Sequence, residues 1–104
     1  MRIEITARHM VLPESVQEML RTKLQKLERL DEKIVSIHAI FGKEKHLFTV
    51  ELTLAGKGLR LAAKGKHSKD LLTAMEQALE KIERQLKKEE KKKRVESRRR
   101  VEHR

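Results

Sequence analysis

Apolar residues recur with two different periods along this chain, and the order of those periods restricts the fold more than any other feature. Residues 2–8 alternate polar and apolar side chains, as a strand with one buried face does. The same alternation returns in residues 33–42, 47–55 and 58–65. Residues 12–30, and again the chain from about residue 69, carry apolar side chains at the helical period of about 3.6. The pattern predicts the element order β-α-β-β-β-α.

Each predicted strand has one apolar face, so we expect an α+β fold in which both helices cover one face of a four-stranded sheet and leave the other wet. The glycines at 56 and 58 predict a hairpin turn, and Ser68 is a candidate N-cap for the last helix. The predicted strand core is Ile3, Ile5, Ala7, Ile37, Ala39, Phe41, Phe48, Val50, Leu52, Leu54, Leu59, Leu61 and Ala63. The predicted helix core is Val16, Met19, Leu20, Leu24, Leu27, Leu71, Met75, Ala78, Leu79, Ile82 and Leu86.

The apolar stripe of the last helix stops after Leu86, because Glu89 and Lys93 take the positions where it would continue. We therefore expect one domain over residues 1–92 and a basic, mobile tail over residues 93–104. The chain has no cysteine, which excludes disulfide and thiolate chemistry. Its N-terminus has no long apolar run, so we expect neither a signal peptide nor a membrane span, and a cytoplasmic protein.

Basic residues dominate the composition. Lys and Arg number 26 against 16 Asp and Glu, for a formal net charge of +10. A surplus of this size favours a polyanionic partner, nucleic acid before an anionic membrane. The chain has two Phe and neither Tyr nor Trp, so it offers no platform on which bases could stack. We expect binding through phosphates and shape rather than through base reading.

The polar side of the last helix divides into two stripes of opposite charge. The like-charged pair Arg84–Lys88 costs a few tenths of a kcal/mol, and the pair Glu80–Arg84 recovers a similar amount. Stability is indifferent to this segregation, whereas a partner that carries phosphates is not; a merely solvated face is the alternative. The basic stripe consists of Gln77, Lys81, Arg84, Lys88 and Lys91, and the acidic stripe of Glu76, Glu80, Glu83 and Glu90.

The first helix adds three cations. Lys26 and Arg29 lie on a flank of its apolar stripe, whereas Lys23 projects from the middle of that stripe. A cation in that position must either extend past the apolar surface to water or meet an anion. With both helices on one sheet face, we expect their basic flanks to form one continuous surface.

No arrangement of residues points to catalysis or to a metal. The histidines lack the spacing of metal ligands, and no serine lies in a nucleophile elbow. His67, Ser68 and Asp70 surround a helix start, where such residues usually cap the helix. We expect no enzyme, no cofactor, no metal and no small-molecule substrate.

Two stretches together resemble the ribosome hibernation promoting factor family, whose members are also called ribosome-associated inhibitors or subunit-interface proteins. "KDLLTAMEQALEKIERQLKK" is similar to the C-terminal helix of that family, and "IEITARHMVLPESVQEMLRTKLQKLERL" to its first strand and helix. The resemblance covers about residues 1–92 and has the same element order. It departs from the family pattern at Leu72, where a Tyr is usual, and at Ala7, where a Gly is common. The chain resembles the short form of the family.

The resemblance implies a fold related to double-stranded RNA-binding domains. It also implies binding to ribosomal RNA of the small ribosomal subunit, in the channel for mRNA and the A- and P-site tRNAs. A monomer there would stop translation and preserve idle ribosomes in stress or stationary phase. Positions matching the family's RNA-facing residues are Lys23, Lys26, Lys81, Arg84, Gln85 and Lys88, and the charge pattern adds Arg29 and Lys91 to the candidate site.

Two other functions stay open from the sequence. A general module for duplex RNA or DNA would carry the same fold and charge. A protein-interaction role is the third possibility, because modulation of an alternative sigma factor has been attributed to some members of the family.

Overall fold

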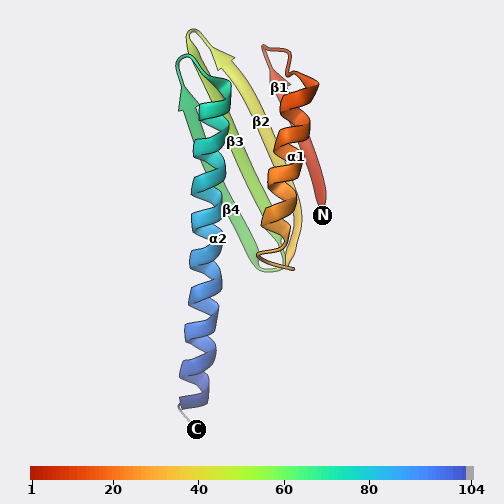
Figure 1. Cartoon of the computed structure of the whole chain (residues 1–104). Coiled ribbons are helices and arrows are strands. Elements are labelled where there is room, and N and C mark those ends of the chain that lie inside the picture. Colours follow the sequence, from red (N-terminus) through yellow and green to blue (C-terminus); the bar gives the residue numbers. More distant parts are fainter. Residues whose placement is uncertain (103–104) are drawn as a thin grey trace.

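The computed structural model describes the backbone of residues 1–102 and the side chains of residues 1–91, and it confirms the predicted order of elements. Both helices lie on the same face of one four-stranded sheet (Figure 1). The elements are β1 (Arg2–Arg8), α1 (Glu14–Glu28), β2 (Ile34–Glu44), β3 (Leu47–Gly56), β4 (Leu59–His67) and α2 (Leu71–Glu102).

The strands lie in the order β1-β2-β3-β4. β1 pairs with β2 in parallel, which requires the crossover that α1 provides. β2, β3 and β4 are joined by tight turns and pair antiparallel. The predicted hairpin at residues 56–58 is confirmed: Gly56 pairs with Leu59, and Gly58 adopts a φ of +64°, which glycine accepts without strain.

The core lies between the helices and one sheet face, as the alternation predicted. Of the predicted core residues, Met19 is 41% exposed on α1, and Ala7 is exposed because it lies near the end of the edge strand β1. Leu12 and Ile34 are buried although they lie at the borders of elements, where periodicity gives no signal. The buried residues include Leu20, Leu24, Leu27, Ile37, Ala39, Phe41, Val50, Leu52, Leu54, Leu59, Ala63, Ala74, Met75, Ala78, Leu79, Ile82 and Leu86.

The start of α2 corrects the prediction that Ser68 caps it. The helix begins at Leu71, and Asp70 is the residue that caps it. Its carboxylate accepts hydrogen bonds from the Leu72 backbone N–H at 3.0 Å and from the Thr73 hydroxyl at 2.7 Å. The ring of His67 accepts the backbone N–H groups of Lys69 and Asp70 through Nδ1, at 3.2 and 3.0 Å. Asp70 is preferred because its carboxylate reaches the free N–H groups of the first turn.

Replacing Asp70 with Ala should lower the melting temperature, and Asp70→Asn should lower it less, because Asn keeps an acceptor for the backbone N–H. The hydrogen bond from Thr73, assisted by backbone N–H groups, holds the pKa of Asp70 below its usual value. A lowered pKa in the folded state stabilises the fold above the usual pKa of Asp, and this contribution is lost as the pH falls through the folded value. Thermal melts between neutral and acidic pH should bring the wild-type protein toward the Asp70→Asn variant at low pH, while the difference between the Asn and Ala variants persists; a constant gap between the wild type and Asp70→Asn would contradict the assigned cap.

The α2 backbone continues to Glu102, well past the end of the sheet (Figure 1). The prediction of a mobile tail over residues 93–104 falls on side chains outside the described residues, so it stays a prediction. Within the described part of the chain, no helix is both long and apolar enough to cross a membrane.

Candidate nucleic-acid interface

The two charged stripes of α2 face in different directions, and the packing of α2 decides which stripe meets which neighbour. The Lys23 ammonium of α1 lies 3.1 Å from the carboxylate of Glu76, so the acidic stripe faces α1. The basic stripe lies on the other flank, where Lys81 Nζ donates to the Lys64 carbonyl of β4 at 2.7 Å. β4 is an edge of the sheet, so this flank looks outward.

Three side chains of α2 pair with the free backbone edge of β4. Gln77 accepts from the Lys66 N–H at 3.1 Å, Lys81 donates to the Lys64 carbonyl, and Gln85 donates to the Ala62 carbonyl at 3.0 Å. The spacing matches: four residues of a helix span about 6.0 Å and two residues of a strand about 6.6 Å. Paired in this way, the edge of β4 is closed to another strand.

This edge contact gives Lys81 and Gln85 a structural partner that the charge pattern did not indicate. Both were predicted to face RNA, and both have polar groups already engaged with β4. The i, i+4, i+8 spacing of residues 77, 81 and 85 is visible in the sequence, but its meaning depends on knowing that α2 lies beside β4.

The expected continuous basic surface across the two helices is interrupted where Lys23 meets Glu76. Lys23 meets an anion, Glu76, instead of extending past the sheet, and its side chain is 36% exposed. The acidic stripe therefore lies between the cations of α1 and the basic stripe of α2. Beyond the end of α1, Lys87, Glu90 and Lys91 of α2 line a hollow with Leu30.

The predicted cations outside these contacts are exposed. Arg84, Lys88 and Lys91 are on α2, Lys26 is on α1, and Arg29 directly follows α1. No ion pair among the described residues involves any of the five. Unpaired cations on one rigid helix can bind phosphates without first breaking a contact inside the protein. Arg84, Lys88 and Lys91 are therefore the strongest part of the candidate interface.

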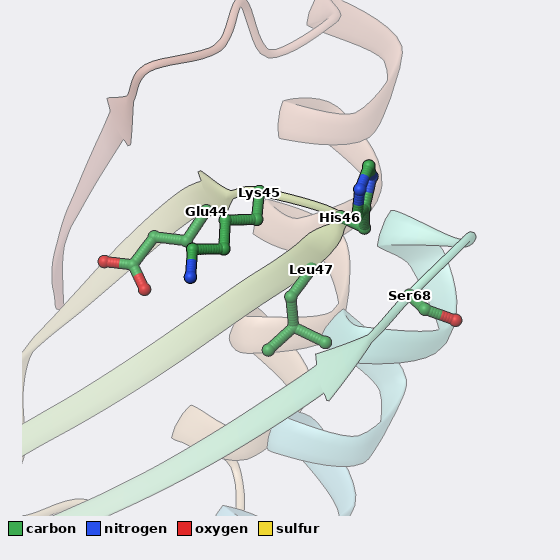
Figure 2. Close-up of a pocket in the computed structure, with 5 residues that line it drawn as sticks. All are labelled: Glu44, Lys45, His46, Leu47 and Ser68. Atoms are coloured by element: carbon green, nitrogen blue, oxygen red, sulfur yellow. The ribbon is translucent and has the colours of Figure 1, made fainter.

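A pocket at one end of the sheet has no arrangement suited to chemistry. It lies between the β2–β3 turn and the start of α2, and is lined by Glu44, Lys45, His46, Leu47 and Ser68. Figure 2 shows the carboxylate of Glu44 and the hydroxyl of Ser68 pointing in opposite directions. Among the described residues no hydrogen bond joins His46 to Ser68, as a base and its nucleophile would require.

Comparison with known proteins agrees with this architecture. Residues 3–94 match the model of the sigma 54 modulation protein / S30EA ribosomal protein family. This chain belongs to that family. The match spans every element of the sheet, α1 and the greater part of α2.

Relatives in the S30EA family are similar over nearly their whole length. The ribosome hibernation promoting factor of Pseudomonas putida is 29% identical over 92 residues, which are 88% of this chain and 89% of the relative. That of Salmonella typhimurium is 28% identical over 88 residues, covering 83% of this chain and 90% of the relative.

Solved structures share the S30EA fold. A ribosomal subunit interface protein from Coxiella burnetii superposes with a TM-score of 0.76 at 24% identity, covering 86% of this chain and 98% of that protein. The N-terminal domain of Protein Y from Thermus thermophilus gives a TM-score of 0.76 at 18% identity, covering 85% and 98%. At these identities the likeness concerns the fold.

Proposed function

We propose that this protein is a ribosome-binding translation inhibitor that preserves inactive ribosomes. The observation that carries the proposal is its membership of the S30EA ribosomal protein family, with relatives named ribosome hibernation promoting factor. We also propose that it binds as a monomer, in the cytoplasm, and that its binding site is the mRNA and tRNA channel of the small subunit.

The free cations of α2 are the proposed contacts to ribosomal RNA. Arg84 and Lys88 lie one helical turn apart on the outward flank, and Lys91 follows within another turn. With no aromatic side chain beside them, they bind phosphates and tolerate any base sequence. Leu72, 38% exposed at the position where a Tyr is usual, supplies apolar contact but no ring that could stack on a base.

The proposed inhibition is occlusion rather than chemistry. A protein lodged in the channel excludes mRNA and tRNA without breaking a bond, and it needs neither a cofactor nor a small-molecule substrate.

Sedimentation of a cell lysate through a sucrose gradient tests the proposal against its two alternatives. Migration with the small subunit or the whole ribosome would support it. Migration with RNA polymerase would instead support modulation of a sigma factor. Retention on RNA or DNA duplexes without ribosome association would indicate a general nucleic-acid-binding module.

The double substitution Arg84→Ala/Lys88→Ala should weaken binding to purified small subunits by about tenfold or more, because it removes two phosphate contacts. Both side chains are exposed and outside the core, so the change in folding stability should be about 0.5 kcal/mol or less. Binding is measured by co-sedimentation, and stability by urea unfolding.

The matched control is Lys57→Ala/Lys69→Ala, which removes the same charge from exposed positions away from the α2 stripe. It should weaken binding much less. If the two double variants lost the same affinity, the effect would be one of net charge alone, and the assignment of a specific binding stripe on α2 would be wrong.

A further inference from the structure

The face of the sheet opposite the helices is uncovered and carries its own set of cations. Its residues follow from strand register: one row across the sheet is Arg8, Gly42, Thr49 and Lys66, and another is Arg2, Ser36, Ala55 and Arg60. Figure 1 shows both helices on the other side.

Four cations of this open face stand at its corners, and a fifth, Lys64, lies in a middle row. Three strand spacings separate Arg8 from Lys66, and also Arg2 from Arg60, which is about 14 Å. Six residues along a strand separate the two rows, about 20 Å. Within each of these two rows the side chains between the corners are short, so an extended polyanion could lie close to the backbone there; they are Gly42 and Thr49 in one row, and Ser36 and Ala55 in the other. The two middle rows carry longer side chains, namely Glu4, His38, Ile40, Glu51 and Lys64.

The acidic residues of the face are already neutralised. Glu4 pairs with Arg2, whose hydrogen bond holds the pKa of Glu4 below its usual value, and Glu51 pairs with Lys64 at 3.7 Å. Among the described residues, no ion pair engages Arg8, Arg60 or Lys66. Five cations against two carboxylates therefore leave three positive charges unopposed.

Gly42 opens a hollow on this face. The hollow measures about 250 Å³ and lies beside Arg8, Lys43 and Lys64, which outnumber its two acidic residues, Glu44 and Glu51. Gly42 does not have a positive φ, so its backbone conformation does not require glycine. Its lack of a side chain instead leaves room, because a Cβ there would lie 2.9 Å from the Thr49 hydroxyl. A phosphate in this hollow would find cations and a hydroxyl beside the space that Gly42 leaves open.

We propose that the open sheet face is a second phosphate-binding surface, which holds an RNA backbone segment different from the one contacted by α2. RNA is favoured over a membrane because a membrane-binding face needs large apolar side chains. Here the apolar side chains lie in the rows that face the helices, and Ile40 is the one large apolar residue in the rows of the open face. RNA would then contact the protein both at α2 and at the opposite face of the sheet. This inference rests on the proposed function, since the RNA is that of the ribosome.

The test uses the full chain and purified small ribosomal subunits over a range of salt. The open-face triple variant Arg8→Gln/Arg60→Gln/Lys66→Gln should lower affinity on the order of a hundredfold at about 0.1 M salt. It should also reduce the slope of log affinity against log salt by roughly 2 to 3, about 0.7–0.9 for each lost phosphate. Unchanged affinity and slope would overturn the proposal.

A second pair of variants separates the effect of charge from the effect of packing at the hollow. Gly42→Asp and Gly42→Asn add side chains of the same shape, so both meet Thr49, but only the first brings a negative charge. We expect Gly42→Asp to bind about tenfold or more weakly than Gly42→Asn. Equal affinities would overturn the role of the hollow even if the triple variant fails to fold.

Two further outcomes separate this surface from the proposed function. If Arg84→Ala/Lys88→Ala weakens binding and the triple variant does not, the proposed function stands and the second surface falls. If the triple variant keeps full affinity for subunits but loses binding to phosphatidylcholine vesicles containing phosphatidylglycerol, the RNA assignment is overturned in favour of a lipid surface.

Discussion

The substitution Gly65→Ala is expected to destabilise the fold by about 3 kcal/mol, a large share of the stability of so small a domain. Gly65 is buried on β4 beneath α2. A Cβ at this position would overlap the Ala74 carbonyl oxygen and lie 2.9 Å from the Ala78 nitrogen. Both obstacles are helix backbone, which no change of rotamer can move aside, so α2 would have to shift away from the sheet.

Urea unfolding measures this effect, and Gly42→Ala is the matched control. Gly42 is also a strand glycine without a positive φ, but its added Cβ would meet only the Thr49 hydroxyl, which can rotate. The control should cost about 1 kcal/mol or less. A Gly65→Ala protein as stable as the control would mean that α2 does not approach β4 as closely as described.

Because α2 lies so close to β4, a displacement of α2 at Gly65 would also change the candidate nucleic-acid interface. Ala74 and Ala78 are fully buried against β4, and the next turns carry Lys81 and Gln85 to the edge of that strand. If α2 moves outward at Gly65, these side chains lose the carbonyl groups they contact. Arg84 and Lys88, which share the helix, would change position relative to the sheet.

The sequence predicted the elements and most of the core because each element buries one face, and burial of one face imposes a period. Ile37, Ala39 and Phe41 were placed inward by alternation alone, and all three are buried. The prediction for Ser68 was wrong because the sequence does not show at which residue the helix begins. A small polar residue caps a helix only if its side chain can reach the free N–H groups of the first turn. Asp70, two residues later, is in reach.

The candidate site was less predictable, because it depends on which elements become neighbours. Helical periodicity separated the basic and acidic stripes of α2, but it could not say that the acidic stripe would face α1. Lys23 was recognised as unusual, yet its partner Glu76 lies far along the chain and became visible only when the helices were side by side. The cations of the open sheet face, such as Arg8 on β1 and Lys66 on β4, are spread over different strands, so no local pattern gathered them.

Inhibition of a cell-free translation system should saturate near one protein per ribosome, with translation falling to a small residual level. The reason is that occlusion, the proposed mechanism, is stoichiometric: each molecule blocks one channel and is not released by turnover. An enzyme, in contrast, would inactivate many ribosomes at a small molar ratio. The measurement is a titration of reporter synthesis against known ribosome concentration.

Competition decides whether the blocked site is the channel itself. Added mRNA and tRNA should relieve the inhibition in proportion to their concentration, because the same RNA surface cannot hold both. The Arg84→Ala/Lys88→Ala protein should need a higher concentration to reach the same plateau, since the substitutions weaken binding and leave the shape of the bound protein intact. Inhibition that is complete far below one protein per ribosome, or ribosomal RNA found cleaved after the reaction, would contradict occlusion and indicate catalysis by residues that the described part of the chain does not bring together.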